Sequence, residues 1–418
     1  MIQSCLSEGE VKPFVKDYGM VIVDECHHVS SVSFELVLRQ VTATFVYGLT
    51  ATPIRKDGHQ PIIFMQCGKI RFTSDAKSQM ENQGFKRLLI PRFTSFRSIT
   101  ADRKTYVQIT QELSEDKVRN EFVMEDVKAA IQKGRTPLVL TTRTAHVKAL
   151  AQMLMPFVDH VIQLIGADSA KEKRLALQNL QSIPTSESLV IVATGKYVGE
   201  GFDYPRLDTL FLTMPIAWKG DVEQYAGRLH REYEGKSEVC IYDYVDIRVP
   251  LCDSMYRKRL KGYARAGYGK NVTSPAPDKK SQELIYEQNN YEAAFRNDLA
   301  KAKHSVVIAV PKVKFKYKPS IMSALANLLH NGVSVVVHVK EEGANEIELS
   351  NAGMDVVCNK EQTLQCAVIG KAIVWYGNIN FFGYNSETNN VMRIADHKIA
   401  NEMMEILYSA TENKVNGG

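Results

Sequence analysis

The stretch Val21-Ile22-Val23-Asp24-Glu25-Cys26-His27-His28 decides how the rest of the chain is interpreted. Its three branched apolar residues predict a strand that is buried on both faces, as strands of parallel sheets are. Two carboxylates follow where this strand ends, and open α/β sheets bind their ligands beyond the carboxyl ends of strands. Asp24 supplies the oxygen ligands that Mg²⁺ prefers, and Glu25 can deprotonate a water that attacks a γ-phosphate. An isolated Asp-Glu pair is more often a pair of surface acids, so the surrounding motifs decide between the two interpretations.

A second short motif, Gly48-Leu49-Thr50-Ala51-Thr52-Pro53, follows downstream. The two segments resemble motif II (the Walker B box, here in its DECH form) and motif III of superfamily-two DEAD/DEAH-type helicases. The resemblance implies that Asp24 binds Mg²⁺ and that Glu25 is the catalytic base of ATP hydrolysis. Thr50 and Thr52 would couple the nucleotide state to the grip on nucleic acid. Residues 54–58 also resemble family members that work on duplex DNA.

A second α/β pattern begins at Pro137, where apolar strands alternate with amphipathic segments of helical length. This alternation predicts a second parallel sheet. Within it, residues 194–203 resemble motif V of the same helicases. The resemblance implies that Thr194 and Gly195 face the nucleic-acid backbone, while Gly201 and Asp203 approach the nucleotide.

The segment Gln224-Tyr225-Ala226-Gly227-Arg228-Leu229-His230-Arg231 resembles motif VI, Q-x-x-G-R-x-x-R. Arg228 and Arg231 are three residues apart and are expected to share one helical face, where two guanidiniums can converge on phosphate oxygens. Such arginines, with Gln224, would stabilise the transition state of ATP hydrolysis, and Gly227 would permit close approach to the partner domain. A bare R-x-x-R is usually a solvated basic helix, but the order of motifs II, III, V and VI favours the catalytic interpretation. Motif IV is the weakest match, at Arg143.

No phosphate loop of the form G-x-G-K-[ST] occurs in the 418 residues. Gly267-Tyr268-Gly269-Lys270 is rejected because Asn271 follows it and because it lies in a basic stretch rather than between a strand and a helix. We therefore expect the chain to be the C-terminal part of a longer protein, or to receive its phosphate loop from a partner subunit. The net charge of +5 permits a nucleic-acid partner. Seven scattered cysteines, with neither a signal sequence nor a membrane span, suggest a cytoplasmic protein.

The last third of the chain carries a different pattern. Residues 373–382 resemble the end of a phospholipase D-like domain, in which G-S-x-N follows H-x-K-x4-D. That chemistry needs a histidine nucleophile, a lysine and an acid, but the corresponding positions hold Thr363, Gln365 and Gly370. Asn378 replaces the serine, and Asn380 alone remains. His338-Val339-Lys340, with Asn345 at the acid position, follows an earlier strand and is interpreted as a chance match.

These patterns predict an α/β protein with two RecA-like parallel-sheet motor domains, the first truncated, and a degenerate phospholipase D-like domain. The expected boundaries are residues 1–95, 96–250, a basic linker 251–284, and 285–418. The basic stretch of this linker either tracks phosphates, with Tyr263 or Tyr268 stacking on a base, or is a solvated helix end. The leading function is an ATP- and Mg²⁺-dependent DNA helicase or translocase, with the nucleotide between the motor domains. A non-catalytic DNA-binding scaffold is the alternative, and a phospholipase D-type nuclease is the least favoured.

Overall fold

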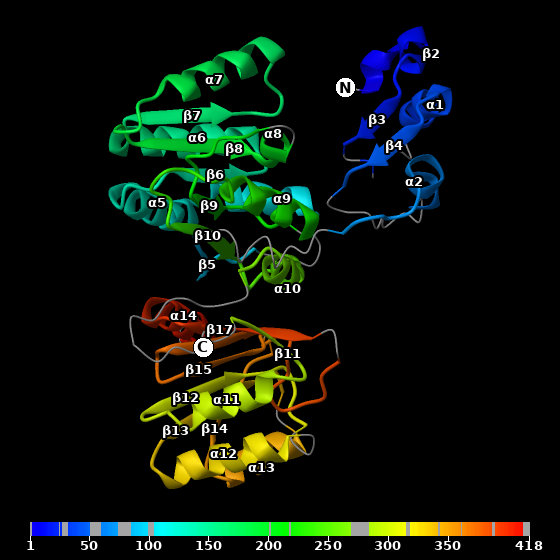
Figure 1. Ribbon diagram of the computed structural model, residues 1–418. Helices are drawn as coiled ribbons and strands as arrows, with labels where there is room; N and C mark the ends of the chain where they lie inside the picture. The colour runs from blue at the N-terminus through cyan, green and yellow to red at the C-terminus, as the bar shows by residue number, and fades with distance from the viewer. Residues whose placement is uncertain are drawn as a thin grey trace. The chain divides into compact units, whose positions relative to one another are not determined.

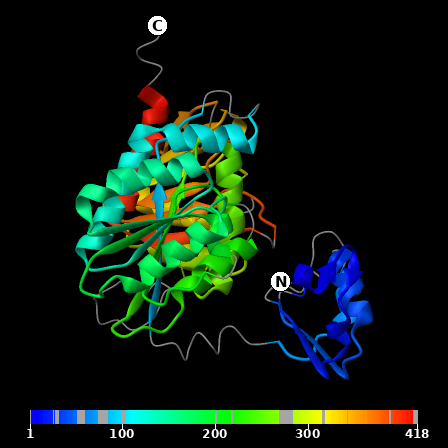
Figure 2. The ribbon, with the colours of Figure 1, turned by 90° about the horizontal axis from the view of Figure 1, so that it is seen from above.

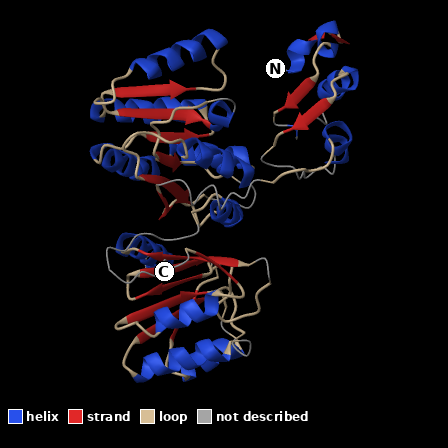
Figure 3. Ribbon diagram, in the orientation of Figure 1, coloured by secondary structure: helices blue, strands red, loops and turns tan. Residues whose placement is uncertain are grey.

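A computed structural model of the chain describes most of the 418 residues, and its contacts divide it into two compact units, Met1–Asp75 and Ala76–Gly418. Mixed α/β layers with parallel strands build both units (Figure 1, Figure 3). The described residues are 2–24, 26, 32–50, 60–73, 85–98, 104–199, 202–216, 219–268, 284–314, 318–341, 343–360, 362–386 and 389–412.

The first unit, drawn in blue in Figure 2, is built around two parallel strands. β3 (Met20–Val23) pairs with β4 (Phe45–Gly48), and Val23 lies beside Gly48. Helices α1 (Val32–Gln40) and α2 (Gln60–Cys67) pack against one face of the pair through a small core. The remaining elements are η1 (Ile2–Cys5), β1 (Leu6–Ser7), β2 (Glu10–Val11) and η2 (Pro13–Lys16).

The prediction that the first strand is buried on both faces is wrong. Val23 is buried, whereas Ile22 is 60% exposed. Side chains alternate along a strand, and the core of this unit lies on the Val23 side only. The opposite face of the strand pair presents exposed apolar side chains, namely Met20, Ile22, Phe45 and Tyr47.

The second unit begins with a six-stranded sheet whose strands are all parallel. Three of its strands, those that span 137–141, 189–194 and 209–212, are apolar and buried along their whole length, as expected for a sheet covered on both faces. The strand order is β5 (Lys86–Phe93), β10 (Glu238–Val245), β9 (Thr209–Leu212), β6 (Pro137–Thr141), β8 (Leu189–Thr194) and β7 (His160–Leu164).

The expected domain boundary at residue 95 is too late. β5 pairs with β10 along its whole length, from Lys86 beside Glu238 to Phe93 beside Val245. Residues 86–93 therefore belong to the second sheet and not to the first unit. The sequence alone does not place this strand, because a strand at a sheet edge has no sequence mark that tells which sheet it joins.

Helices cover both faces of this sheet. α5 and α6 pack on one face, where Val127 and Leu150 meet Val139 and Val192. α9 packs on the other face through Val222 and Leu229. The bounds are α4 (Tyr106–Glu115), α5 (Lys117–Gln132), α6 (Thr144–Leu154), η5 (Met155–Phe157), α7 (Ala170–Ser182), α8 (Gly195–Gly199) and α9 (Lys219–Leu229).

Residues 251–265 of the predicted basic linker belong to a helix, α10 (Pro250–Arg265), which buries Tyr256, Leu260 and Tyr263. Tyr263 and Tyr268 are fully buried, so the expectation that either stacks on a base is wrong. The Tyr263 hydroxyl donates to Asp243 Oδ2 at 2.6 Å, and the buried Arg259 pairs with the same carboxylate. The basic residues misled the prediction because Arg259 neutralises a buried acid instead of facing solvent.

A second sheet of seven strands forms the C-terminal part. β12, β13 and β14 are parallel, and the other strands are antiparallel. Three helices cover one face, and α14 lies on the other (Figure 1). The strand order is β11 (Ile285–Glu287), β17 (Asn390–Ala395), β16 (Ile373–Gly377), β15 (Cys366–Ile369), β12 (Ser305–Ala309), β13 (Ser334–Val339) and β14 (Asp355–Cys358), and the helices are α11 (Tyr291–Leu299), α12 (Pro319–His330), α13 (Ala344–Asn351) and α14 (His397–Glu412).

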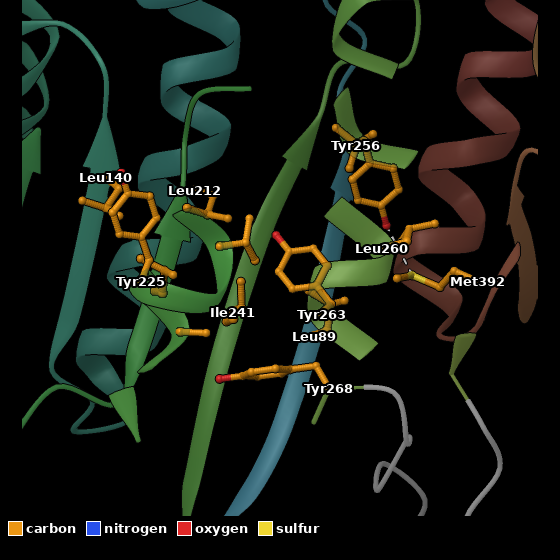
Figure 4. Packing of buried hydrophobic residues seen from close by; sticks show 14 of the residues in the cluster. Leu89, Leu140, Leu212, Tyr225, Ile241, Tyr256, Leu260, Tyr263, Tyr268 and Met392 are labelled. Atoms are coloured by element: carbon orange, nitrogen blue, oxygen red, sulfur yellow. Dashed lines mark hydrogen bonds between the residues drawn. The ribbon is translucent and has the colours of Figure 1, made fainter. Parts of the chain in front are cut away.

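The two large sheets share one apolar core, to which α10 and α14 contribute (Figure 4). The Tyr256 hydroxyl of α10 reaches Met392 Sδ of β17 at 3.3 Å. Polar contacts cross the same boundary, since Arg92 Nη2 lies 2.9 Å from Glu402 Oε1. Residues on both sides of the 268–284 segment therefore form one packed body.

Candidate functional site

The carboxyl ends of β3 and β4 meet at one edge of the first unit. Leu49 N–H donates to Val23 O, and Cys26 N–H donates to Leu49 O, both at 2.9 Å. These bonds hold the turn that bears Asp24 against the segment that leads to Thr50. Asp24 is exposed at this edge. The structure thus brings the motif II aspartate and the first motif III threonine to the same end of the strand pair, where open α/β sheets bind ligands.

Glu25 and Thr52 lie outside the described residues.

The packing directly behind motif II is tight, because a Cβ placed on Gly48 would lie 2.8 Å from Cys26 Sγ and 2.9 Å from Cys67 Cβ. Burial, together with the neighbouring Cys26 thiol, raises the pKa of Cys67 to about 11. All seven cysteines lie in described residues, and none of them forms a disulfide.

The described ranges contain no group of three or more His, Cys, Asp or Glu side chains arranged to hold a metal ion. The predicted Mg²⁺ role of Asp24 does not need such a group, because Mg²⁺ keeps most of its coordination for water and substrate phosphate.

The motif V residues follow β8 in the second unit. Thr194 is buried, and its hydroxyl accepts a hydrogen bond from Gly166 N–H at 2.9 Å. A Cβ on Gly195 would lie 2.5 Å from the hydroxyl oxygen of Tyr225, a residue of motif VI. Motifs V and VI are thus in contact, and Gly195 is required for that contact. Gly201 lies outside the described residues.

The two motif VI arginines are held by motif V. Arg228 Nε donates to Val198 O at 3.2 Å, and Arg231 Nε lies 3.1 Å from Asp203 Oδ1. Arg231 and Asp203 are both about half exposed, so their guanidinium and carboxylate groups face solvent. Gln224 lies on α9 and is partly buried.

The prediction that Arg228 and Arg231 share a helical face is wrong. α9 ends at Leu229, and Arg231 lies in the segment that follows. R-x-x-R spacing fits a helix, but it fits a helix end followed by a turn equally well. Arg231 is positioned by its ion pair and by backbone contacts, not by helical periodicity.

The structure also identifies residues that the sequence did not single out. Tyr225 was quoted only as a variable position of motif VI, yet it contacts motif V. Lys236 Nζ reaches the carbonyls of two motif VI residues, Leu229 and Arg231, and that of Pro205, two residues after motif V. The only sequence signal for Lys236 is its place directly after Gly235, which has a positive φ of 79°.

Arg143, the weak motif IV candidate, precedes α6 and is partly buried. Its Nη1 lies 3.4 Å from Val107 O, which ties α6 to α4. Nearby, the buried His146 ring bridges Thr141 Oγ1 and Asn120 Oδ1, and burial lowers the pKa of His146 to about 3. His146 is therefore neutral and structural.

Two asparagines at the positions compared with the phospholipase D-like G-S-x-N pattern accept hydrogen bonds from nearby backbone N–H groups. Asn378 Oδ1 accepts from Asn390 N–H at 2.7 Å, and Asn380 Oδ1 accepts from Phe382 N–H at 2.9 Å. His338 is 3% exposed, with its ring against Tyr408. A ring buried in this way cannot reach a phosphodiester, which agrees with the interpretation of His338 as a chance match.

Residues 2–55 match the protein family described as type III restriction enzyme, res subunit. A protein of Acanthamoeba polyphaga mimivirus named as an ATP-dependent RNA helicase is 24% identical over 255 residues, which is 59% of this chain and 47% of that protein. A protein of Invertebrate iridescent virus 6 named as a helicase is 25% identical over 264 residues, covering 61% of this chain and 57% of its own length. These matches support a helicase-family relationship, and the chain spans about half the length of these relatives.

Two solved structures are each similar to part of the chain. A fragment of an HsdR subunit of a type I restriction enzyme from Vibrio vulnificus gives a TM-score of 0.43 at 18% identity, covering 55% of this chain and 44% of that one. A phospholipase D family member, Nuc from Salmonella typhimurium, gives a TM-score of 0.27 at 20% identity, covering 31% of this chain and 91% of that one. Among the described residues, every helix is too short or too polar to cross a membrane.

Proposed function

We propose that this chain is the C-terminal part of an ATP-dependent superfamily-two DNA helicase or translocase. One observation carries the proposal: the motif V and motif VI residues Asp203 and Arg231, distant in sequence, form an ion pair whose charged groups remain accessible. A solvated basic helix would not require its arginine to meet an acid from another motif. The family-level similarity to helicases supports the same conclusion.

In this proposal Asp24 binds Mg²⁺ and Glu25 activates the attacking water. Arg228 and Arg231 stabilise the charge that develops on the transferred phosphoryl group, a contribution typically worth about 10³–10⁵ in rate. Asp203 and Gly201 approach the same ATP, and Gln224 assists on the motif VI side. ATP-driven closure would then move DNA that is held near Thr194, Gly195, Thr50 and Thr52.

The partners in this proposal are duplex DNA and a polypeptide segment that supplies the phosphate loop. The exposed apolar face of the β3–β4 pair supports the proposal of a segment that supplies the phosphate loop. Ile22 and Phe45 are 60% and 51% exposed, and they lie on a parallel strand pair of a kind that is normally covered on both faces. A helix with an apolar stripe would remove this surface from water.

The test is ATP hydrolysis by residues 1–418 with and without duplex DNA, beside a Glu25→Gln variant. DNA-stimulated turnover that is lost in Glu25→Gln is the expected result for a working motor. Absence of turnover with DNA still bound would favour the alternative, a DNA-binding part that cannot hydrolyse ATP alone. The sequence favours that alternative in one respect, because its 418 residues contain no phosphate loop.

A further inference from the structure

The backbone at Arg231 lies beyond α9, so contacts other than helical hydrogen bonds must hold it in place. α9 ends two residues earlier, at Leu229. The chain then turns back, with Lys236 N–H donating to Tyr233 O at 3.1 Å and Gly235 at a φ of +79°. Glycine is favoured there because that conformation is strained for other residues. The turn returns Lys236 to the end of α9.

The Lys236 ammonium binds three backbone carbonyls from two segments. Nζ donates to Leu229 O at 3.1 Å and to Arg231 O at 2.8 Å. It also donates to Pro205 O at 2.5 Å, two residues after Asp203. A cation at the last turn of a helix complements the helix dipole. One side chain therefore connects the segment that bears Arg231 with the segment that bears Asp203.

Several charged groups face this ammonium. Asp208 and Asp203 favour its charged form, but burial has the larger effect and lowers the pKa of Lys236 to about 8. Directly after α9, His230 is neutral because burial and the nearby Arg87 and Lys236 lower its pKa to about 3. On the adjoining strand, Glu238 pairs with Arg135, which also faces Asp208.

We propose that Lys236 is a positioning residue that holds Arg231 and Asp203 in the arrangement needed to act on the nucleotide. The inference rests on the proposed function for its catalytic consequence, but the link between the two segments is a structural claim that can be tested separately. An ammonium has three N–H donors, one for each carbonyl, whereas a neutral amine has two. Loss of the proton therefore releases at least one carbonyl.

The first experiment measures hydrogen exchange in full-length wild type, Lys236→Met and Lys236→Arg. Lys148→Met, which removes an exposed lysine of α6, is the matched control. We expect peptides covering 226–237 and 203–208 to exchange about fivefold faster in Lys236→Met, because two segments lose one shared contact. Unchanged exchange in the 203–208 peptide would overturn the proposal.

The second experiment measures ATP hydrolysis against pH. Misplacement of a catalytic group by about 1 Å costs on the order of 10²-fold, so Lys236→Met should lower kcat by about that factor while KM changes little. Wild-type kcat should fall as pH rises through about 8. Lys236→Arg should keep its rate there, because a guanidinium stays protonated.

Deprotonation of Lys236 cannot lower kcat at alkaline pH by unfolding the protein. Between the folded pKa of about 8 and the ordinary value of 10.5, the unfolded state binds more protons at Lys236, so this group makes the fold more stable as pH rises. An equal alkaline loss in wild type and Lys236→Arg would overturn the positioning role. If wild type hydrolyses no ATP either alone or with its phosphate-loop partner, the proposed function is contradicted, while the exchange data still decide whether Lys236 links the two segments.

Discussion

Gly227→Ala separates a catalytic need for glycine from a structural one. Gly227 is exposed on α9, and a Cβ added there would lie within 4 Å of no described atom beyond its chain neighbours and the adjacent helix backbone. The substitution therefore meets no steric obstacle among the described residues. Alanine in a helix is favoured over glycine by about 0.5–1 kcal/mol, and this close to the helix end the gain should lie near the lower value. We expect Tm to rise by about 1–3 °C.

The proposed function predicts the opposite effect on activity. If another surface approaches α9 closely when ATP is bound, the added methyl group holds that surface away from Arg228 and Arg231. A displacement of about 1 Å would then lower kcat on the order of 10²-fold. The assay is DNA-stimulated ATP hydrolysis beside thermal unfolding, in whichever preparation turns over: the chain alone or the chain with its phosphate-loop partner.

Gly195→Ala is the matched control, because its Cβ would lie 2.5 Å from the Tyr225 hydroxyl and 3.3 Å from its Cζ. Tyr225 is buried, so the ring must shift, at a cost of about 1–3 kcal/mol. Gly195→Ala should therefore lose stability and activity together, whereas Gly227→Ala should lose activity alone. Full activity in a stabilised Gly227→Ala protein would refute the idea that this glycine allows close approach.

Four further predictions concern separate features. Arg231→Ala should lower kcat by about 10³-fold or more in steady-state ATPase assays but cost under about 1 kcal/mol in urea unfolding, because its ion pair with Asp203 is exposed. Burial raises the pKa of Glu402 to about 7, so stability should fall as pH rises from 4.5 to that value, and Glu402→Gln should flatten this fall in urea titrations. Truncation after residue 268 should give insoluble protein in expression trials, since it uncovers Tyr256 and its apolar neighbours. Wild type should not cut DNA without ATP, and cutting that His338→Ala abolishes would show that the chance-match interpretation is wrong.

The sequence predicts best where chemistry requires particular residues at fixed positions. Asp24 is expected where its strand ends, and it lies there. The strand register brings Thr50 to the same edge, because parallel strands carry their carboxyl ends to the same side. The mixed α/β class with parallel sheets was predicted from strand and helix alternation, and it is confirmed.

Prediction failed where the outcome depends on contacts between distant residues. The end of α9 before Arg231 depends on a turn and on Lys236, and R-x-x-R spacing contains neither. α10 was read as a linker from its charge, although Tyr256, Leu260 and Tyr263 have the spacing of one helical face. The partner of β5 could not be predicted, because pairing depends on β10, which lies far along the chain.

The shared core of the two large sheets has a mechanical consequence. α10 and α14 fill the space between the sheets with close-packed side chains, and such packing resists independent movement. A rotation of the six-stranded sheet therefore carries the seven-stranded sheet through the same angle. A point on the far side of the C-terminal sheet moves further than a point near the rotation axis, in proportion to its distance from that axis. A small rotation at one end of this unit thus becomes a larger displacement of anything bound at the other.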